Sequence, residues 1–591
     1  MTFYLIDHSL KDFGGHHFDY ATLILRAAEV SGFDVILATN RRFHADGRFP
    51  DSWRVLPLFR YHAYSRYSVH GGWQDGALGL DGRRLSLLST RRFLDIGVVN
   101  RWWRLWNFEK ACRELFTQAP LSGGDQVFIP TLSEFDLLGL VRFLKSCGDT
   151  TKADWHLQFH FSFLNGRDPE YDRQHEVQSQ FQRQFQGALR QLEGHRLHVY
   201  PTTEELARQY TRLGVADFHP LTYPIRGVFH PPRSRRINTP LRVTSAGAVR
   251  PEKGQQHLSE LVTRLWTDYF AAGKLQLAIQ CKSTRFSRSP RRVVDSADVG
   301  RLNARFRLPD EDCHDPVIYI RHPIDSKDYV RLIRGSDVGL LMYDQHRYYG
   351  RHAGVLGEYL SAGVPVIVPA GCWLAEQLAG PIHSHLDSLL GRPDSYNLAM
   401  EEAEDAATVR PTPESSRGFT KTEPFTCRVR LPPQASDLLL GFSWLEPQAA
   451  GTYVQVTARQ YDSRRREVSC ATTIASRRQP ASMLFHLHTH SELVELQWST
   501  AYDDARALIA KPRAQPLLGP RRPGGHYPAG RVGLIAATPQ EVPALLEDIY
   551  QHYEHYRQSS LAFSERWHRD HRPEKTLARL LLSSEKQRAA A

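Results

Sequence analysis

Two glycine-bearing segments of the sequence place charged side chains where they could hold an anionic ligand. In the first, Arg250 and Lys253 lie between Gly247 and Gly254, after an apolar run typical of a buried strand. Arg250 offers a planar fork of donors to a phosphate, and Lys253 offers a point charge. Glycines and a helix expected to begin near Gly254 would add backbone N–H groups. These residues predict a diphosphate site with both cations exposed in a cleft; a solvated surface turn is the alternative.

The second segment predicts a helix that could hold a nucleotide. Gly354 stands where this helix should begin, and its backbone N–H groups could meet a phosphate. Glu358 follows about one turn later and could accept two hydrogen bonds from a ribose diol. Apolar residues flank Glu358, so the helix is expected to be buried. An ordinary exposed helix carboxylate is the alternative for Glu358.

Histidines at the ends of two expected strands are candidate catalytic residues. His16 and His17 follow Gly14 and Gly15 at the first strand-to-helix turn, where open α/β sheets bind their ligands. His160 lies near the end of a later strand that should face the same cleft. Histidines that are simply hydrogen-bonded within loops are the alternative.

No metal site is predicted. His486, His488 and His490 alternate along an expected strand without a fourth ligand, which favours a polar sheet face. The acidic residues at 310–312 are interpreted as a loop. The sequence contains no Walker loop, GxSxG elbow or HExxH motif.

Apolar runs alternate with helical spacing through most of the chain, which predicts an α/β fold with two doubly wound parallel sheets. The first sheet is expected to use residues 3–6, 34–38, 126–129, 156–161 and 196–200, with helices over 18–30 and from Glu204. The second sheet is expected to use residues 242–245, 275–279, 317–320, 338–342 and 364–368.

The hydrophobic period changes from 3.6 to 2 between about residues 425 and 502, which predicts a small β-sandwich inserted into the second domain. Its strands are expected at 425–431, 452–458, 483–488 and 493–498. Residues 503–530 contain five prolines and are interpreted as a linker, after which the α/β pattern resumes.

The composition is that of a globular protein with two or three domains. The 591 residues carry a net charge of +11, which suits an anionic ligand. No nucleic-acid partner is expected, because the basic residues are scattered and no nucleic-acid-binding motif is present. Seven widely spaced cysteines, an N-terminus without signal-peptide charges and the lack of a long apolar run predict a cytoplasmic protein, with peripheral membrane association left open.

The two charged segments carry a resemblance to a known family. Residues 247–254 resemble the G-x-x-R-P-x-K-G segment of GT-B glycosyltransferases, the group that contains the family 4 retaining enzymes. Residues 351–368 are similar to their R-x-S-G-x-x-x-E-A-x-x-x-G-x-P-V-V-V segment. The resemblance covers about residues 1–380 and 531–575.

This resemblance implies two Rossmann-like domains and transfer of a sugar from a nucleotide-diphosphate donor to a glycan, lipid-linked or other hydroxyl acceptor, with retention and without a separate cofactor. Arg250, Lys253, Arg351, Gly354 and Glu358 would bind the donor. Gly14 and Gly15 would lie beneath the transferred sugar, and His160, together with His16 or His17, would contact that sugar as candidate catalytic residues.

The implied domains are residues 1–222 for the acceptor, 223–400 for the donor, 401–505 for the β module, and 506–591 for a linker and a return to the second domain. Aromatic residues of the module could stack on sugars if exposed, but core packing is the expected role for most of them; these are Trp444, Tyr453, Tyr461 and Trp498.

Three positions depart from the family pattern. Gly350 replaces the first of two glutamates, Ala353 replaces the usual serine, and Ala248 replaces an arginine. A GT-B relative that binds glycans or partners without turnover is therefore an alternative. A sugar-nucleotide epimerase is another, although the carboxylate that it would need is not identified.

Overall fold

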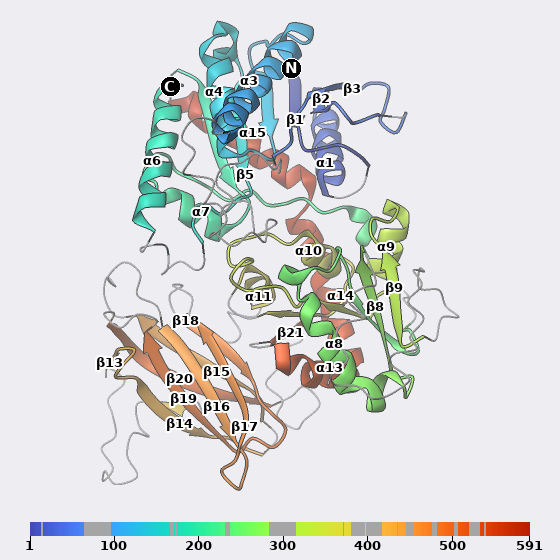
Figure 1. Ribbon diagram of the computed structural model, residues 1–591, viewed down its shortest axis with the longest axis vertical. Coiled ribbons are helices and arrows are strands. Elements are labelled where there is room, and N and C mark those ends of the chain that lie inside the picture. The colour runs from blue at the N-terminus through green and yellow to red at the C-terminus, as the bar shows by residue number, and fades with distance from the viewer. Residues whose placement is uncertain are drawn as a thin grey trace.

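The protein is described by a computed structural model. The described residues are 1–13, 16–45, 47–63, 96–165, 171, 174–192, 194–230, 237–282, 315–369, 372–379, 396–397, 416–433, 435–444, 454–474, 481–500, 506–518, 532–536 and 539–590. They form two domains built on parallel sheets and a β-sandwich that lies beside the second of them (Figure 1).

The first domain is a six-stranded parallel sheet with strand order β3-β2-β1-β4-β5-β6. The strands are β1 (Thr2–Asp7), β2 (Asp34–Asn40), β3 (Arg54–Phe59), β4 (Gln126–Ile129), β5 (Asp154–Phe159) and β6 (Arg196–Pro201). The helices are α1 (His16–Val30), α3 (Ile96–Gln118), α4 (Glu134–Lys145), α6 (His175–Arg190) and α7 (Glu204–Thr211). Apolar side chains are buried on both faces of the sheet, with α3, α4 and α6 on one face and α1 on the other.

The second domain is also a six-stranded parallel sheet, with order β21-β11-β10-β7-β8-β9. The strands are β7 (Leu241–Ser245), β8 (Leu275–Cys281), β9 (Val317–Arg321), β10 (Val338–Leu340), β11 (Val366–Pro369) and β21 (Gly533–Ala536). The helices are α8 (Leu258–Leu265), α9 (Ser326–Arg334), α10 (Gly354–Ser361), α11 (Trp373–Ala379), α13 (Val542–Gln551) and α14 (Tyr553–Asp570). The predicted fold of two Rossmann-like domains is confirmed by these two sheets.

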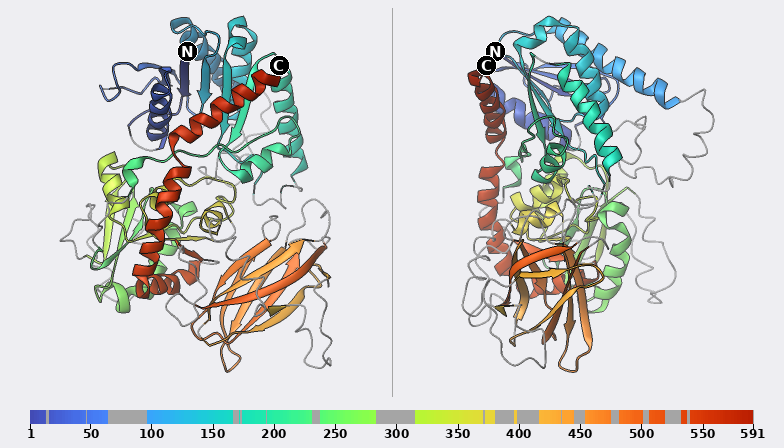
Figure 2. Two further views of the ribbon diagram at one scale, coloured as in Figure 1. Left: turned by 180° about the vertical axis from the view of Figure 1, so that it is seen from behind. Right: turned by 90° about the vertical axis from the view of Figure 1, so that its left-hand side faces the viewer.

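The last helix, α15 (Pro573–Ala590), returns to the first domain and not to the second as the sequence predicts. Leu577 and Leu580 are buried in the core beside α1, and Ser584 donates to the side chain of Gln126 at 2.9 Å. Figure 2 shows α14 and α15 running along the back of the molecule from the second domain to the first. The C-terminal segment therefore ties the two domains together.

The β-sandwich consists of two antiparallel sheets with an apolar core between them. One sheet contains β12 (Tyr396–Asn397), β13 (Ser416–Phe419), β15 (Ala435–Trp444), β18 (Ala481–His486) and β20 (Ala507–Leu518). The other contains β14 (Phe425–Arg430), β16 (Val454–Tyr461), β17 (Glu467–Ile474) and β19 (Leu493–Thr500). After the sandwich, the chain returns to the sheet of the second Rossmann-like domain at β21, which pairs with β11. The module is therefore an insertion in that domain, as predicted.

The linker predicted over 503–530 is wrong for residues 507–518, because these form β20. Two of the prolines that indicated a linker, Pro512 and Pro516, lie within this strand. Pro512 lies at a register shift between β20 and β15, opposite residues 441–443, where a missing N–H does not break the ladder. Prolines within a strand therefore led the sequence pattern to predict a linker where a strand is present.

The structure places two of the candidate aromatic residues of the β module and corrects the interpretation of its histidines. Trp498 is fully buried in the sandwich core, and Tyr461 faces outward from β16; Tyr453 lies outside the described residues. The three alternating histidines do not share a strand, because β18 ends at His486 and His488 and His490 follow it. No cluster of metal-binding side chains occurs within the described part of the chain.

No helix among the described segments is long and apolar enough to cross a membrane.

Candidate functional site

A cavity of about 810 Å³ opens between the two Rossmann-like domains. The first domain contributes Asp19, His160, Phe161 and Thr202. The second domain contributes the loops that follow β7, β8, β9 and β10, together with the start of α10. The pocket thus lies at the carboxyl ends of parallel strands, where open α/β sheets bind ligands, and it has the volume of a small-molecule site.

Lys253 is held within the loop that follows β7. Its side chain is only 9% exposed, and its Nζ donates to the carbonyl oxygen of Gly247 at 2.5 Å. Burial and the nearby Arg250 lower the pKa of Lys253 to about 8. The expectation that Lys253 is exposed is therefore wrong. The ammonium still lines the pocket, and its reduced hydration strengthens its attraction for an anion.

Backbone contacts fix the shape of this loop. Gly247 and Gly254 have φ values of +84° and +78°, which favour glycine. A Cβ on Gly254 would lie 2.2 Å from the carbonyl oxygen of Met342, and a Cβ on Gly247 would lie 2.9 Å from Nζ of Lys253. Both glycines are therefore needed to bring the loop against β10 and to seat the lysine.

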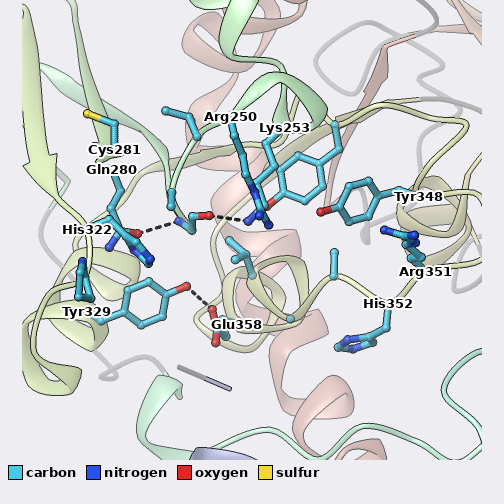
Figure 3. A pocket seen from close by; sticks show the side chains of 18 of the residues that line it. Arg250, Lys253, Gln280, Cys281, His322, Tyr329, Tyr348, Arg351, His352 and Glu358 are labelled. Atoms are coloured by element: carbon cyan, nitrogen blue, oxygen red, sulfur yellow. Dashed lines mark hydrogen bonds between the residues drawn. The ribbon is translucent and has the colours of Figure 1, made fainter. Parts of the chain in front are cut away.

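Arg250 is more than half exposed, as predicted, and its Nε lies 2.7 Å from a carboxylate oxygen of Glu252. The helix expected near Gly254 begins later than predicted. Two short helical turns, η4 (Pro251–Lys253) and η5 (Gln255–His257), come first, and α8 follows them. Figure 3 shows Arg250 and Lys253 entering the pocket on the side opposite Glu358.

Tyr343 places a buried hydroxyl beside these cations without a partner. The side chain is 5% exposed, and its hydroxyl has no hydrogen bond in the described structure. The ring lies 5.2 Å from Nζ of Lys253, and a Cβ on Gly247 would be 3.8 Å from the hydroxyl oxygen. A buried donor without an acceptor is costly, so we infer that this hydroxyl donates to a ligand oxygen in the pocket.

Replacing this hydroxyl tests that role. We expect Tyr343→Phe to raise the melting temperature of the free protein, because it removes an unsatisfied buried polar group. We also expect it to weaken nucleoside diphosphate binding by about tenfold, the loss of one hydrogen bond to a charged group. Calorimetric titration and thermal unfolding would measure both effects, with Tyr269→Phe as the matched control. Unchanged nucleotide affinity would show that the hydroxyl does not touch the ligand.

Glu358 lies on α10, which begins at Gly354 as predicted. The hydroxyl of Tyr329 donates to its Oε2 at 2.5 Å. Burial raises the pKa of Glu358 to about 7, with the nearby Asp19 adding to the rise and the Tyr329 hydrogen bond opposing it. The carboxylate is thus held in place by one donor and has acceptor capacity left for a ligand diol.

Direct contacts between the domains border the pocket. Arg226, in the segment between the two sheets, forms an ion pair with Asp19 of α1 at 3.0 Å and donates to Ser326 of α9 at 2.7 Å. Thr203, at the start of α7, donates its hydroxyl to the carbonyl oxygen of Gly350 at 2.5 Å. These contacts hold the two walls of the pocket together.

Arg351 and His352 line the pocket just before α10. The ring of His352 stacks on Tyr223 at 4.5 Å and contacts Trp373 at 4.7 Å. Burial lowers the pKa of His352 to about 3, so this imidazole is neutral at physiological pH. It forms a packed wall of the pocket and not a charged one.

His160 lies in the pocket, as predicted, directly after β5. Its Nε2 donates to the carbonyl oxygen of Pro130 at 2.5 Å, and burial lowers its pKa to about 4. The ring is therefore neutral, and Nδ1 is its acceptor. His17 has its Nδ1 3.0 Å from Asp7 and is not among the residues that line the pocket.

The other predicted residues of the first domain are placed as follows. His16 is the first residue of α1. Gly14 and Gly15 lie outside the described residues, as do the acidic residues at 310–312.

Several pocket residues carry no recognisable signal in the sequence. Tyr329 belongs to α9 and reaches Glu358 from a separate helix, and Gln280 accepts the backbone N–H of Gly247 at 2.7 Å from the end of β8. His322 follows β9 and has a buried Nδ1 without a partner in the described structure. For Gln280 and His322, only their positions at the carboxyl ends of β8 and β9, at the edge where ligands bind, could have indicated them.

No family model matches the sequence, and no curated protein matches it. A structure described as trehalose-6-phosphate from E. coli bound with UDP-2-fluoro glucose aligns over 64% of this chain and 86% of its own, with 12% identity and a TM-score of 0.38. WaaG, a glycosyltransferase involved in lipopolysaccharide biosynthesis, aligns over 64% and 84%, with 12% identity and a TM-score of 0.37. A UDP-forming trehalose-phosphate synthase from Burkholderia xenovorans aligns over 64% and 86%, with 13% identity and a TM-score of 0.39.

These similarities are distant. The chain's own two parallel sheets, with a ligand cavity between them, define the GT-B architecture that the sequence predicts.

Proposed function

We propose that this protein is a retaining glycosyltransferase that transfers a sugar from a nucleotide-diphosphate donor to a hydroxyl acceptor. One observation carries the proposal: Arg250, Lys253, the unpartnered hydroxyl of Tyr343 and Glu358 converge on a single interdomain cavity. The first three suit a diphosphate and Glu358 suits a ribose.

The proposed donor spans the pocket from Glu358 to the loop after β7, with its sugar toward His160. In the reaction, the bond between the anomeric carbon and the phosphate oxygen breaks, and the acceptor oxygen bonds to the same carbon on the same face. The acceptor proton passes to the leaving phosphate oxygen. Arg250 and Lys253 stabilise the charge that develops on the diphosphate, so they lower the barrier more than they strengthen ground-state binding.

His160 fits a positioning role in this scheme. With Nε2 held by Pro130 and a pKa of about 4, the ring is a poor base at neutral pH. Its Nδ1 can accept a hydrogen bond from a sugar hydroxyl.

We propose a cytoplasmic location for the protein and a glycan or lipid-linked molecule as its acceptor.

A binding protein without turnover is the second candidate, because Gly350 lacks the acid of the family pattern. A Cβ at position 350 would lie 3.1 Å from the side chain of Glu205, so close packing against α7 accounts for the small residue there. A larger side chain at position 350 would have to displace the Glu205 side chain of α7.

A thermal-shift screen with UDP, GDP, ADP, CMP and TDP tests the proposed donor site. A ligand that binds only the folded state raises the melting temperature of the protein. We expect one nucleotide to stabilise the wild type and Glu358→Ala to lose that stabilisation, while the exposed Glu260→Ala keeps it. If none of the nucleotides shifts the transition, the proposed donor site is wrong.

A further inference from the structure

Helix α14 packs beside α10, the helix that carries Glu358, and is hydrogen-bonded to it at two points (Figure 1). Nε1 of Trp567 on α14 donates to the carbonyl oxygen of Gly357 at 3.1 Å. About one turn further along α10, Oγ of Ser361 lies 2.7 Å from Nε2 of His568. Trp567, Gly357 and Ser361 are all buried. The place of α10 therefore depends on internal contacts with the C-terminal segment.

Gly357 is the point at which both α14 and the segment between the domains touch α10. A Cβ on Gly357 would lie 2.8 Å from Cδ1 of Ile225 and 3.9 Å from Cζ2 of Trp567. The lack of a side chain at this position lets Ile225 reach the backbone of α10. Ile225 is itself buried, so α10 cannot move toward it without displacing it.

Trp567 and Ile225 are fixed to each other through His571. The imidazole of His571 stacks on the indole of Trp567, with 3.8 Å between the ring centroids. The backbone N–H of Ile225 donates to the carbonyl oxygen of His571 at 3.0 Å. Gly357, Trp567, His571 and Ile225 thus form a closed circuit of contacts, in which each member restricts the movement of the others.

This circuit ends one covalent step from Glu358. The carbonyl of Gly357 belongs to the planar peptide group that contains the backbone nitrogen of Glu358, so a bond to that carbonyl also restrains the backbone of Glu358. At the other end of the side chain, the carboxylate accepts the hydroxyl of Tyr329. Glu358 is therefore held at both ends, by Trp567 at its backbone and by Tyr329 at its carboxylate.

We propose that Trp567 and Ile225 are positioning residues of the donor site, which hold the peptide group between Gly357 and Glu358 so that the carboxylate meets the ribose diol. This inference rests on the proposed function, because it requires that Glu358 binds ribose. Hydrogen bonds between oxygen atoms need separations of about 2.5–3.0 Å, so a small displacement of α10 would lose them. Trp567 and Ile225 are not among the residues that line the pocket, so they act through Glu358 and not on the ligand.

Trp567→Phe tests the inference, because it removes the indole N–H and keeps an aromatic ring against His571. The readout is the preference for a ribonucleoside diphosphate over its 2′-deoxy analogue, measured by titration calorimetry below the melting temperature of each protein. We expect the variant to lower the wild-type preference about tenfold, the loss of one hydrogen bond to a charged group. Affinity for the 2′-deoxy ligand should be unchanged, since its diphosphate meets Arg250 and Lys253 in a separate loop.

Trp155→Phe is the matched control. Trp155 is fully buried in the first domain, and its Nε1 donates to the carbonyl oxygen of Thr150 at 2.9 Å. Its replacement therefore removes the same kind of hydrogen bond and should lower the melting temperature without changing the ribose preference.

Ile225→Val is a second variant, which removes the Cδ1 that abuts Gly357 and keeps the rest of the side chain. Such a substitution is mild for a buried residue, so the protein should fold and should show a smaller fall in ribose preference than Trp567→Phe.

A ribose preference that persists in Trp567→Phe overturns the inference, even if both ligands bind more weakly, because a structural role alone would affect both ligands equally. If that variant does not fold, a preference that persists in Ile225→Val overturns it. An equal fall in Trp155→Phe also overturns it. A wild type that binds neither ligand, or binds both equally, contradicts the proposed function instead, so the two failures are distinguishable.

Discussion

Lys253→Ala is expected to lower turnover of the donor by about 10²- to 10³-fold, the usual loss when one preorganised group that stabilises a developing anion is removed. The ammonium is buried at the pocket wall and fixed on the carbonyl oxygen of Gly247, so it needs little rearrangement to meet the leaving diphosphate. Release of nucleoside diphosphate from the nucleotide sugar would measure the effect.

Protein stability should change much less than turnover in this variant. Removing Lys253 leaves the Gly247 carbonyl without its donor, which destabilises the fold. It also relieves the burial of a charge whose pKa is lowered to about 8, which stabilises the fold. These effects oppose each other. Lys274→Ala, at an exposed position, is the matched control, and a large fall in melting temperature with little loss of turnover would assign Lys253 a structural role only.

Glu358→Gln is expected to abolish discrimination between a ribonucleoside diphosphate and its 2′-deoxy analogue. Hydrogen bonds to a charged group contribute about 1.5–3 kcal/mol each, so the wild type should prefer the ribonucleotide by roughly 10- to 100-fold. Titration calorimetry of both ligands against wild type, Glu358→Gln and the exposed control Glu260→Gln forms a complete cycle. Equal discrimination in all three proteins would remove Glu358 from the ribose site.

The pH dependence of this preference has a defined direction. The pKa of Glu358 is raised to about 7, so the carboxylate is lost as pH falls below 7 and the preference for ribose should decline with it. In the free protein the raised pKa means that the folded state holds the proton more tightly than the unfolded state. Wild type should therefore lose stability relative to Glu358→Gln as pH rises from about 4.5 through 7.

The sequence predicts the two parallel sheets well, because buried parallel strands are continuous apolar runs bounded by glycine-bearing turns. It also predicts α10 from Gly354, whose glycine, apolar flanks and following Gly363 mark both ends of the helix. Strand β3 is missed because Pro57 interrupts its apolar pattern. The return of α15 to the first domain depends on where Leu577 and Leu580 are buried, and no local pattern specifies that.

In the site, too, local features are predictable from the sequence and contacts between distant segments are not. The sequence identifies Arg250, Lys253 and Glu358 as candidates because they lie in local motifs. The burial of Lys253 depends on a loop whose glycine at 254 passes against Met342, a contact between segments far apart in the chain. Tyr329 joins Glu358 for a similar reason, because α9 and α10 pack together.

The central claim is that one interdomain pocket binds a nucleoside diphosphate, with its second phosphate at Arg250 and Lys253. The most direct measurement is a titration series of nucleoside, nucleoside monophosphate and nucleoside diphosphate, against wild type and Arg250→Ala/Lys253→Ala. The account predicts a large gain in affinity on adding the second phosphate to the wild-type ligand, and loss of that gain in the double variant. Equal affinities for the monophosphate and the diphosphate in the wild type would contradict it.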